Sequence, residues 1–145
     1  MPNSGPVPYS TMKYICLGYI DYKAFASIPE AEQVAMMDNC FAYDDQLRAN
    51  GNFKGGEALE PSNMAMTLRY TSGKLVVTDG PFAETKEQLG GIMILEARDL
   101  NHAVELISKH PGTKIGPWEI RPAGDLGEML KQSEVRRGVA GKPRG

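Results

Sequence analysis

The chain has 145 residues, 41% of them apolar and 23% charged, with a formal net charge of −2. These values are typical of a single globular domain with one core, and they argue against a nucleic-acid surface. The two cysteines form no Cys-x-x-Cys pair and no Cys/His cluster, which argues against disulfides and structural zinc. The sequence shows neither a membrane span nor a signal peptide, so we expect a cytoplasmic protein that does not bind membranes.

The two ends of the chain differ from its middle. Residues 1–11 contain three prolines and no periodic pattern, which predicts a flexible leader, and Met12 is a candidate native start that intact-mass measurement would test. Residues 131–145 hold five Lys or Arg residues against Glu134, or +4, so residues 1–130 carry −6. We therefore expect one domain over residues 12–124 and a basic tail over 125–145, partly helical or disordered.

The first half of the domain predicts a strand followed by a long helix. Residues 13–20 form a β-type run, and Ser27-Ile28-Pro29-Glu30 has the form of a capping box that opens a helix. This helix is expected to end near Asn50-Gly51, with the glycine in the left-handed conformation. Its apolar face is formed by Val34, Met37, Cys40, Phe41 and Leu47.

The second half predicts short strands around one more helix. Residues 53–59, 64–70 and 75–78 are strand-like, and Thr71-Ser72-Gly73 joins the last two as a hairpin loop. Residues 91–97 form a strand whose apolar run Ile92–Leu95 is expected to be buried on both faces. Asp99 caps a helix that Pro111-Gly112 ends near His110. Residues 118–121 form a last strand, and 125–136 a weak terminal helix.

This order of elements, β-α-β-(β-hairpin)-β-α-β, predicts a ferredoxin-like α+β domain with both helices on one face of an antiparallel sheet. Such a sheet leaves its other face uncovered. A second copy of the chain is the simplest cover, so we expect a homodimer.

The segment from Val77 to Gly91, VTDGPFAETKEQLGG, is the richest in polar groups around a turn. Asp79 either accepts turn amides or acts as a general base. Glu57 follows the glycine pair Gly55-Gly56, which suggests a bulge or a close approach of another group to the backbone. If the two strand ends are neighbours, Glu57 and Asp79 face one cleft and form an acid–base pair.

Further candidates surround this pair. Lys86 is either an exposed loop charge or a partner for an anionic substrate group. Phe82 walls the pocket or, as we prefer, anchors its loop in the core. Asp44 lies within the apolar stripe of the first helix, where a carboxylate needs a partner or solvent at the helix border.

The two histidines predict little chemistry. His102 is expected on the solvated side of the second helix, and His110 at that helix's C-terminus, where an imidazolium interacts favourably with the helix dipole. Neither has a carboxylate or cysteine at ligand spacing in the sequence, so no metal and no cofactor is expected. Nucleotide-binding glycine motifs and the common hydrolase motifs are missing as well.

The string from Val77 to Gly91 closely resembles the YCII-related, Asp-Gly-Pro-Phe family of small bacterial proteins. Supporting pieces are Lys13-Tyr14, Leu47-Arg48-Ala49, Gly55-Gly56-Glu57-Ala58-Leu59, His110-Pro111 and Glu119-Ile120-Arg121-Pro122. The resemblance covers about residues 12–122 and implies a dimeric α/β barrel of ferredoxin-like type, with a cleft between sheet and helices.

The resemblance also bears on function. A related ring-processing, dechlorinating enzyme is assigned a His-Asp pair, but residues 21–27 here contain no histidine, so that pair is not carried over. Relatives encoded beside extracytoplasmic-function sigma factors imply a regulatory partner.

Two hypotheses follow. In the first, the protein is an enzyme, a lyase or isomerase acting on a small anionic or carbonyl compound, with Asp79 and Glu57 transferring protons and Lys86 offsetting charge. Asp44 is a buried reserve candidate in this hypothesis. In the second, it is a regulatory dimer that senses a metabolite or contacts a sigma factor without turnover.

Overall fold

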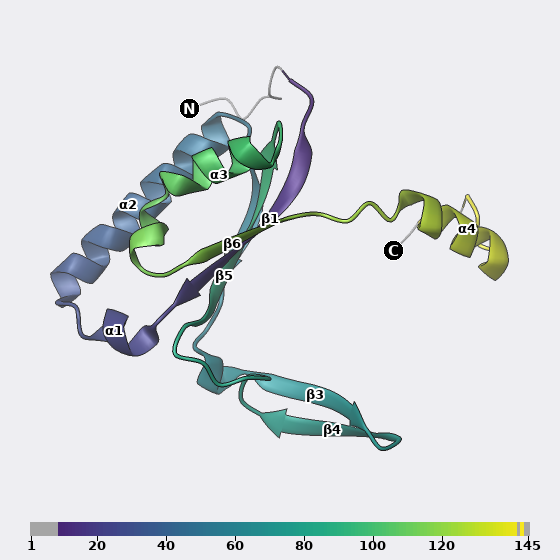
Figure 1. The fold of residues 1–145 in the computed structure, drawn as a ribbon, viewed down its shortest axis with the longest axis horizontal. Helices are drawn as coiled ribbons and strands as arrows, with labels where there is room; N and C mark the ends of the chain where they lie inside the picture. The colour runs from purple at the N-terminus through teal and green to yellow at the C-terminus, as the bar shows by residue number, and fades with distance from the viewer. Residues whose placement is uncertain (1–8, 142, 144–145) are drawn as a thin grey trace.

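The computed structural model describes residues 9–141 and 143. Four antiparallel strands form one sheet in the order β2-β5-β1-β6, comprising β1 (Met12–Ile20), β2 (Phe53–Ala58), β5 (Gln88–Ala97) and β6 (Trp118–Pro122). Helices α2 (Glu30–Ala49) and α3 (Leu100–Ser108) lie on one side of this sheet (Figure 1). The expected α+β class with a ferredoxin-like strand order is confirmed. The sheet of the described residues is open, so the dimeric barrel remains a proposal.

The core lies between the sheet and the two helices. Alternate residues of the central strands point into it, because successive side chains of a strand lie on opposite faces. Fully or almost fully buried side chains come from both central strands and both helices: Tyr14, Cys16, Met93, Leu95, Ala97, Leu47, Ala103 and Ile107. This single cluster fixes the positions of α2 and α3 on the sheet.

The opposite face of the sheet carries a half-buried apolar stripe. Ile92 and Ile94 alternate with buried Met93 and Leu95, and they pair across to Leu17 and Ile15. The expectation that the run Ile92–Leu95 is buried on both faces is therefore wrong for one chain, because no helix of the described residues covers this second face.

The start of the long helix differs from the predicted capping box. A short helix, α1 (Tyr22–Ala26), precedes α2 and was not predicted. Ser27 ends α1 by donating its hydroxyl to the Ala24 carbonyl at 2.6 Å, so it is not free to cap α2. Pro29 takes the N-cap position of α2 instead, without a side-chain hydrogen bond. The C-terminal end of α2 is as predicted, because Gly51 adopts the left-handed conformation with a φ of 81°.

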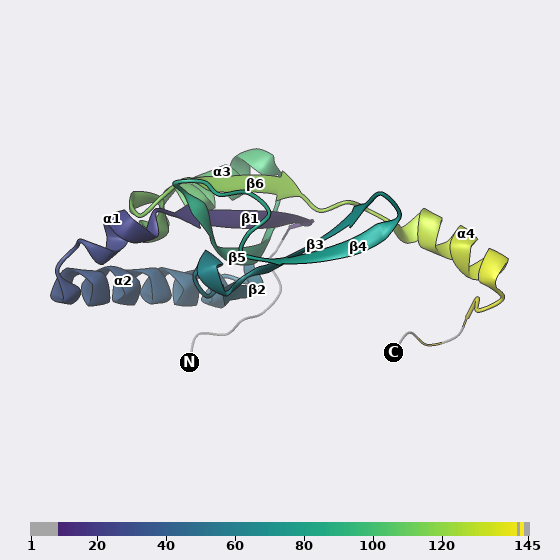
Figure 2. The ribbon, with the colours of Figure 1, turned by 90° about the horizontal axis from the view of Figure 1, so that it is seen from below.

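A hairpin stands apart from the sheet. Strands β3 (Met66–Thr71) and β4 (Lys74–Asp79) pair with each other and, within the described residues, with no strand of the main sheet. Ser72 and Gly73 form its turn with φ of 51° and 78°, and a short 3-10 helix, η1 (Ser62–Met64), leads into it. The hairpin projects away from α2 and α3 (Figures 1 and 2).

The C-terminal region also leaves the body of the domain. After η2 (Pro111–Lys114) and β6, an extended segment leads to α4 (Gly127–Arg137), which lies well away from the sheet (Figure 1). Most of the predicted leader, residues 1–8, lies outside the described residues. None of the described helices is long and apolar enough to span a membrane.

Candidate functional site

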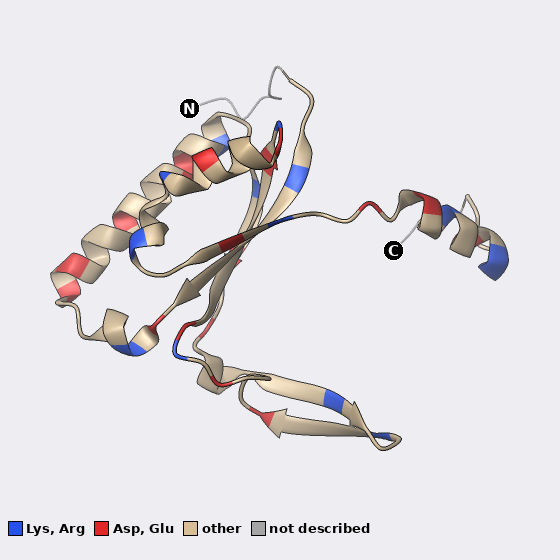
Figure 3. Ribbon diagram, in the orientation of Figure 1, with Lys and Arg blue, Asp and Glu red and all other residues tan. Residues whose placement is uncertain are grey.

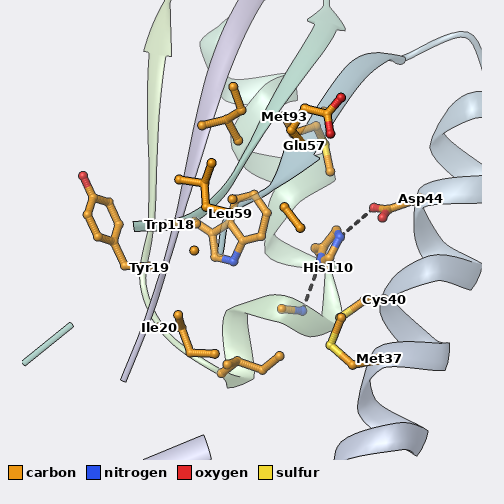
Figure 4. Close-up of a pocket in the computed structure, with 18 of the residues that line it drawn as sticks. Tyr19, Ile20, Met37, Cys40, Asp44, Glu57, Leu59, Met93, His110 and Trp118 are labelled. Atoms are coloured by element: carbon orange, nitrogen blue, oxygen red, sulfur yellow. Dashed lines mark hydrogen bonds and ion pairs between the residues drawn. The ribbon is translucent and has the colours of Figure 1, made fainter. Parts of the chain in front are cut away.

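A cavity of about 430 Å³ lies between the sheet and α2. Its walls are mostly apolar, and its aspartate, histidine and glutamate come from α2, from the loop after α3 and from the end of β2 (Figure 4). The side chains that shape it include Ile20, Met37, Cys40, Phe41, Asp44, Phe53, Glu57, Met93, His110 and Trp118. Among the described residues that line it there is no lysine and no arginine.

The cavity contains a histidine–carboxylate pair. His110 Nε2 lies 2.8 Å from Asp44 Oδ1, although the two residues are 66 positions apart in the sequence. The His110 side chain is 4% exposed and that of Asp44 is 23% exposed. In Figure 4, Asp44 reaches from α2 toward the imidazole. The carboxylate thus has the partner that its place in an apolar stripe requires.

Backbone and aromatic groups fix the imidazole in place. The amide of Gly112 donates to His110 Nδ1 at 2.9 Å. The ring lies between two aromatic rings, with centroid distances of 5.4 Å to Tyr43 and 5.1 Å to Trp118. Tyr43 is itself held, since its hydroxyl donates to the Leu106 carbonyl at 2.6 Å. His110 therefore has one orientation in the folded chain.

This hydrogen-bond pattern determines the tautomer of His110. Because Nδ1 accepts the Gly112 amide, it carries no proton, so the neutral ring has its proton on Nε2 and donates it to Asp44. A proton on Nδ1 as well would bring the Nδ1–H group and the Gly112 N–H group together, two donors without an acceptor. His110 is thus a fixed donor, and Asp44 is the member of the pair that is able to accept a further proton.

Glycines make room for this arrangement. A Cβ atom on Gly112 would lie 2.9 Å from His110 Nδ1 and 3.1 Å from Trp118 Cζ2. A Cβ atom on Gly18 would lie 3.0 Å from the same indole ring. Both contacts are shorter than side chains tolerate without a shift, so the two glycines let Trp118 and His110 pack against the backbone.

Cys40 lies one turn before Asp44 on the wall of the cavity. Burial raises the pKa of its thiol above the ordinary value, and the negative charge of Asp44 raises it further. Since the thiolate is the nucleophilic form, this environment disfavours nucleophilic catalysis by Cys40. In residues 9–141 and 143, no three His, Cys, Asp or Glu side chains are grouped as a metal ion would need.

The predicted site residues do not all meet. Glu57 and Asp44 line the cavity, and the predicted bulge in β2 is present between Phe53 and Gly55. Asp79, by contrast, ends β4 at the base of the hairpin and is not among the residues that line the cavity. Its carboxylate makes no hydrogen bond or ion pair within the described part of the chain.

Lys86 and Phe82 lie on the loop between β4 and β5. Lys86 lines a second, more polar cavity of about 670 Å³ together with Lys23, Glu84 and Asp21. Phe82 is 78% exposed, so the expected anchoring of this loop in the core is wrong for the single chain. Its carbonyl instead accepts from Arg69 Nη2 at 3.0 Å.

Sequence reasoning missed the central contact of the site. Asp44 was a candidate, but His110 was interpreted through the helix dipole, and no carboxylate was expected near it. The contact depends on how α2 and the loop after α3 pack on the same sheet, which spacing in the sequence does not reveal. Two unusual positions in the sequence could have indicated the contact. Asp44 is a carboxylate within an apolar stripe, and His110 directly precedes Pro111.

Comparison with known proteins shows to which family the chain belongs. The model of the YCII-related domain family matches residues 12–125. The chain is also 33% identical over 115 residues to an uncharacterised protein of Rhizobium meliloti (strain 1021), an alignment that spans 77% of this chain and 91% of that protein.

Proposed function

Since the chain belongs to the YCII-related domain family, we propose that it is an acid–base catalyst acting on a small molecule in the cavity beside α2. The observation that carries this proposal is the partly buried pair in which His110 Nε2 donates to Asp44 Oδ1. A fixed donor beside a carboxylate that is 23% exposed, at the wall of an apolar cavity, is an arrangement suited to proton transfer.

The two residues have different roles in this proposal. Asp44 is the catalytic base: its Oδ2, which makes no hydrogen bond within the described residues, takes a proton from a carbon beside a carbonyl group or from a hydroxyl group. His110 is a positioning residue that orients the carboxylate through Oδ1. Returning the proton to another atom of the substrate gives an isomerisation, and returning it to a leaving group completes an elimination.

The cavity favours a neutral, largely apolar substrate. Its lining residues include two acidic ones, Asp44 and Glu57, and its described lining holds no cation to balance a substrate's negative charge. Aromatic and sulfur-containing side chains, among them Phe53 and Met37, suit a ring or a short hydrocarbon chain. Of the two classes expected from the sequence, a carbonyl compound is therefore favoured over an anion.

The proposal is tested by proton exchange with solvent. Neutral carbonyl and phenolic compounds are incubated with the protein in D₂O, and loss of their proton signals is followed by NMR. We expect exchange with the wild type and none above background with Asp44→Asn, whose shape and hydrogen bond to His110 are retained. Asp79→Asn, a carboxylate outside the cavity, is the matched control and should exchange like the wild type.

Either of two results contradicts the proposal. Exchange that survives in Asp44→Asn would mean that another group moves the proton. Compounds that stabilise both proteins equally in a thermal-shift screen, without any exchange, would mean that the cavity binds without turnover.

A second candidate function is the binding of a regulatory protein, such as an extracytoplasmic-function sigma factor. The observation favouring it is α4, whose Met129 and Val135 are 65% and 70% exposed on a helix away from the body of the domain. A pull-down that depends on these two side chains, and not on Asp44, would support this function over catalysis.

A further inference from the structure

The polar cavity of about 670 Å³ adjoins the cavity beside α2. Tyr22, the first residue of α1, lines both of them. Three stretches of chain pass from one lining to the other within one or two residues: Ile20 to Asp21, Leu59 to Pro61 and Gly90 to Gln88. Because consecutive Cα atoms are about 3.8 Å apart, a small molecule is long enough to occupy both cavities at once.

Tyr22 marks the boundary between the two cavities, and Gly90 makes room for it. A Cβ atom on Gly90 would lie 2.7 Å from Ile20 Cγ2 and 3.4 Å from the Tyr22 hydroxyl oxygen. Burial raises the pKa of this hydroxyl, and the negative charge of Glu60 raises it further, so the group is a neutral donor. Since it makes no hydrogen bond with another described residue, it is available to a molecule that crosses the boundary.

The two cavities differ in their charges. The cavity beside α2 has no lysine or arginine in its described lining, whereas the polar cavity has Lys23 from α1 and Lys86 from the loop before β5. Figure 3 shows basic residues on α1 and on the loop that leads into β5. Neither lysine makes an ion pair or a side-chain hydrogen bond with another described residue, so two ammonium groups are available to an anion.

The polar cavity also has two acidic residues in its lining, Asp21 and Glu84. Asp21 is already engaged, because its Oδ1 accepts the Ala24 amide at 3.1 Å as the N-cap of α1. Glu84 makes no ion pair or hydrogen bond with another described residue and partly offsets the positive charge. An anion is therefore attracted by the two lysines and repelled by Glu84, which predicts opposite effects for removing either charge.

We propose that the polar cavity binds the anionic group of a substrate whose carbonyl part lies in the cavity beside α2, an inference that rests on the proposed function. Lys23 and Lys86 bind a phosphate or carboxylate group as point charges. Ser62 and Asn63 add a hydroxyl and an amide donor, since their side chains make no hydrogen bond with another described residue. The substrate class is thus a carbonyl compound with an anionic group at the end away from the reacting carbon.

This division of the substrate suits proton transfer at Asp44. A negative charge beside the Asp44 carboxylate would be repelled, whereas in the polar cavity the same charge meets two ammonium groups. Contacts to a group that does not react orient the substrate, while its reacting part stays neutral in an apolar environment. Both lysines are exposed, so solvent weakens each interaction, and we expect one charge to change the affinity about fivefold.

The polar cavity is tested with inorganic phosphate. Its binding is followed by NMR through the amide shifts of the labelled protein at constant ionic strength. We expect saturable shifts in residues 21–23, 61–63 and 84–88 and none at the Trp118 indole N–H, which belongs to the other cavity. Acetate titrated in the same way distinguishes the two kinds of anion, because the one that binds more tightly is the group that the substrate carries.

Charge variants separate a specific site from a general attraction of anions. Lys86→Gln should weaken phosphate binding about fivefold, and Glu84→Gln should strengthen it by a similar factor. Lys74→Gln removes an exposed lysine at the start of β4, outside both linings, and should bind phosphate as the wild type does. The inference is overturned if neither anion binds saturably, or if Lys86→Gln and Lys74→Gln weaken binding equally.

A ketone that carries the preferred anion tests whether one molecule occupies both cavities. Hydroxyacetone phosphate, or laevulinate if acetate binds more tightly, should shift the Trp118 indole N–H together with the amides of the polar cavity, and it should bind more tightly than the anion alone. Shifts confined to the polar cavity would overturn the inference. A wild type that binds this ketone in both cavities without proton exchange would contradict the proposed function and leave the anion subsite supported.

Discussion

His110 donates through Nε2 to Asp44 Oδ1 over 2.8 Å, and the Gly112 amide occupies the opposite nitrogen of the same ring. Both nitrogens of a buried imidazole are thus engaged, one as donor and one as acceptor. The pair is held by α2 on one side and by the start of η2 on the other. Among the described residues His110 is one of two buried polar side chains, the other being Asn52, whereas Asp79 at the end of β4 is exposed.

Removing the carboxylate charge should impair proton transfer and leave the fold intact. In Asp44→Asn the amide oxygen is able to accept the Nε2 proton, but the residue no longer takes a proton from a substrate. A general base typically contributes 10²–10⁴-fold to a rate, so exchange in D₂O should fall by about that factor. Far-UV circular dichroism and the unfolding midpoint should match the wild type; a large loss of stability would assign Asp44 a structural role instead.

Removing the imidazole should destabilise the domain. His110→Ala leaves the Gly112 amide and Asp44 without their partner and opens a gap between Tyr43 and Trp118. We expect a loss of about 2–4 kcal/mol in the free energy of unfolding, measured with urea.

The other histidine provides the control for this prediction. His102→Ala removes a partly exposed ring at the start of α3 and should cost less than about 1 kcal/mol. If His102→Ala and His110→Ala lowered the free energy of unfolding equally, His110 would contribute no more to stability than an ordinary surface histidine. In a double-mutant cycle, Asp44→Ala and His110→Ala should be non-additive, because each removes the hydrogen bond between the two side chains.

Local patterns predicted most elements of this fold. The hairpin, the Asp99 cap and the left-handed Gly51 all follow from residues within a few positions of each other, and the structure confirms them. The capping box failed for an equally local reason, because the preceding helix α1 uses the Ser27 hydroxyl.

The site was harder to predict, because it depends on tertiary packing. Asp44 and Glu57 reach one cavity only after α2 has packed on the sheet, and Asp79 stays outside because its strand leaves the sheet. The most specific stretch of sequence, around Asp79, therefore marked the base of the hairpin rather than the wall of the cavity. Long-range contacts of this kind have no period or spacing in a single sequence.

Gly112 should tolerate no side chain. In Gly112→Ala the new methyl group meets His110 and Trp118 at 2.9–3.1 Å, so both rings must shift. We expect a loss of about 1–3 kcal/mol in the free energy of unfolding and a weaker response to ligands that bind in the cavity. Gly124→Ala is the matched control: a Cβ atom there has no neighbour within 4 Å, and its effect should be within about 0.5 kcal/mol. Similar stabilities for the two variants would mean that the packing around His110 is looser than described.

Stability should fall in alkaline solution because of Cys16, which lies in the core. Burial raises the pKa of this thiol from its ordinary 9.0 to about 12. Between these values the unfolded chain releases a proton that the folded chain keeps, so the free energy of unfolding decreases as pH rises, by up to about 1.4 kcal/mol per pH unit. The stabilisation that comes from the protonated Cys16 thiol is fully present below pH 9 and is lost as pH rises through about 12. Urea unfolding at pH 8, 9, 10 and 11 measures this slope, and Cys16→Ala, which lacks the titrating group, should show a shallower one. Parallel slopes in the two proteins would mean that other groups cause the decline.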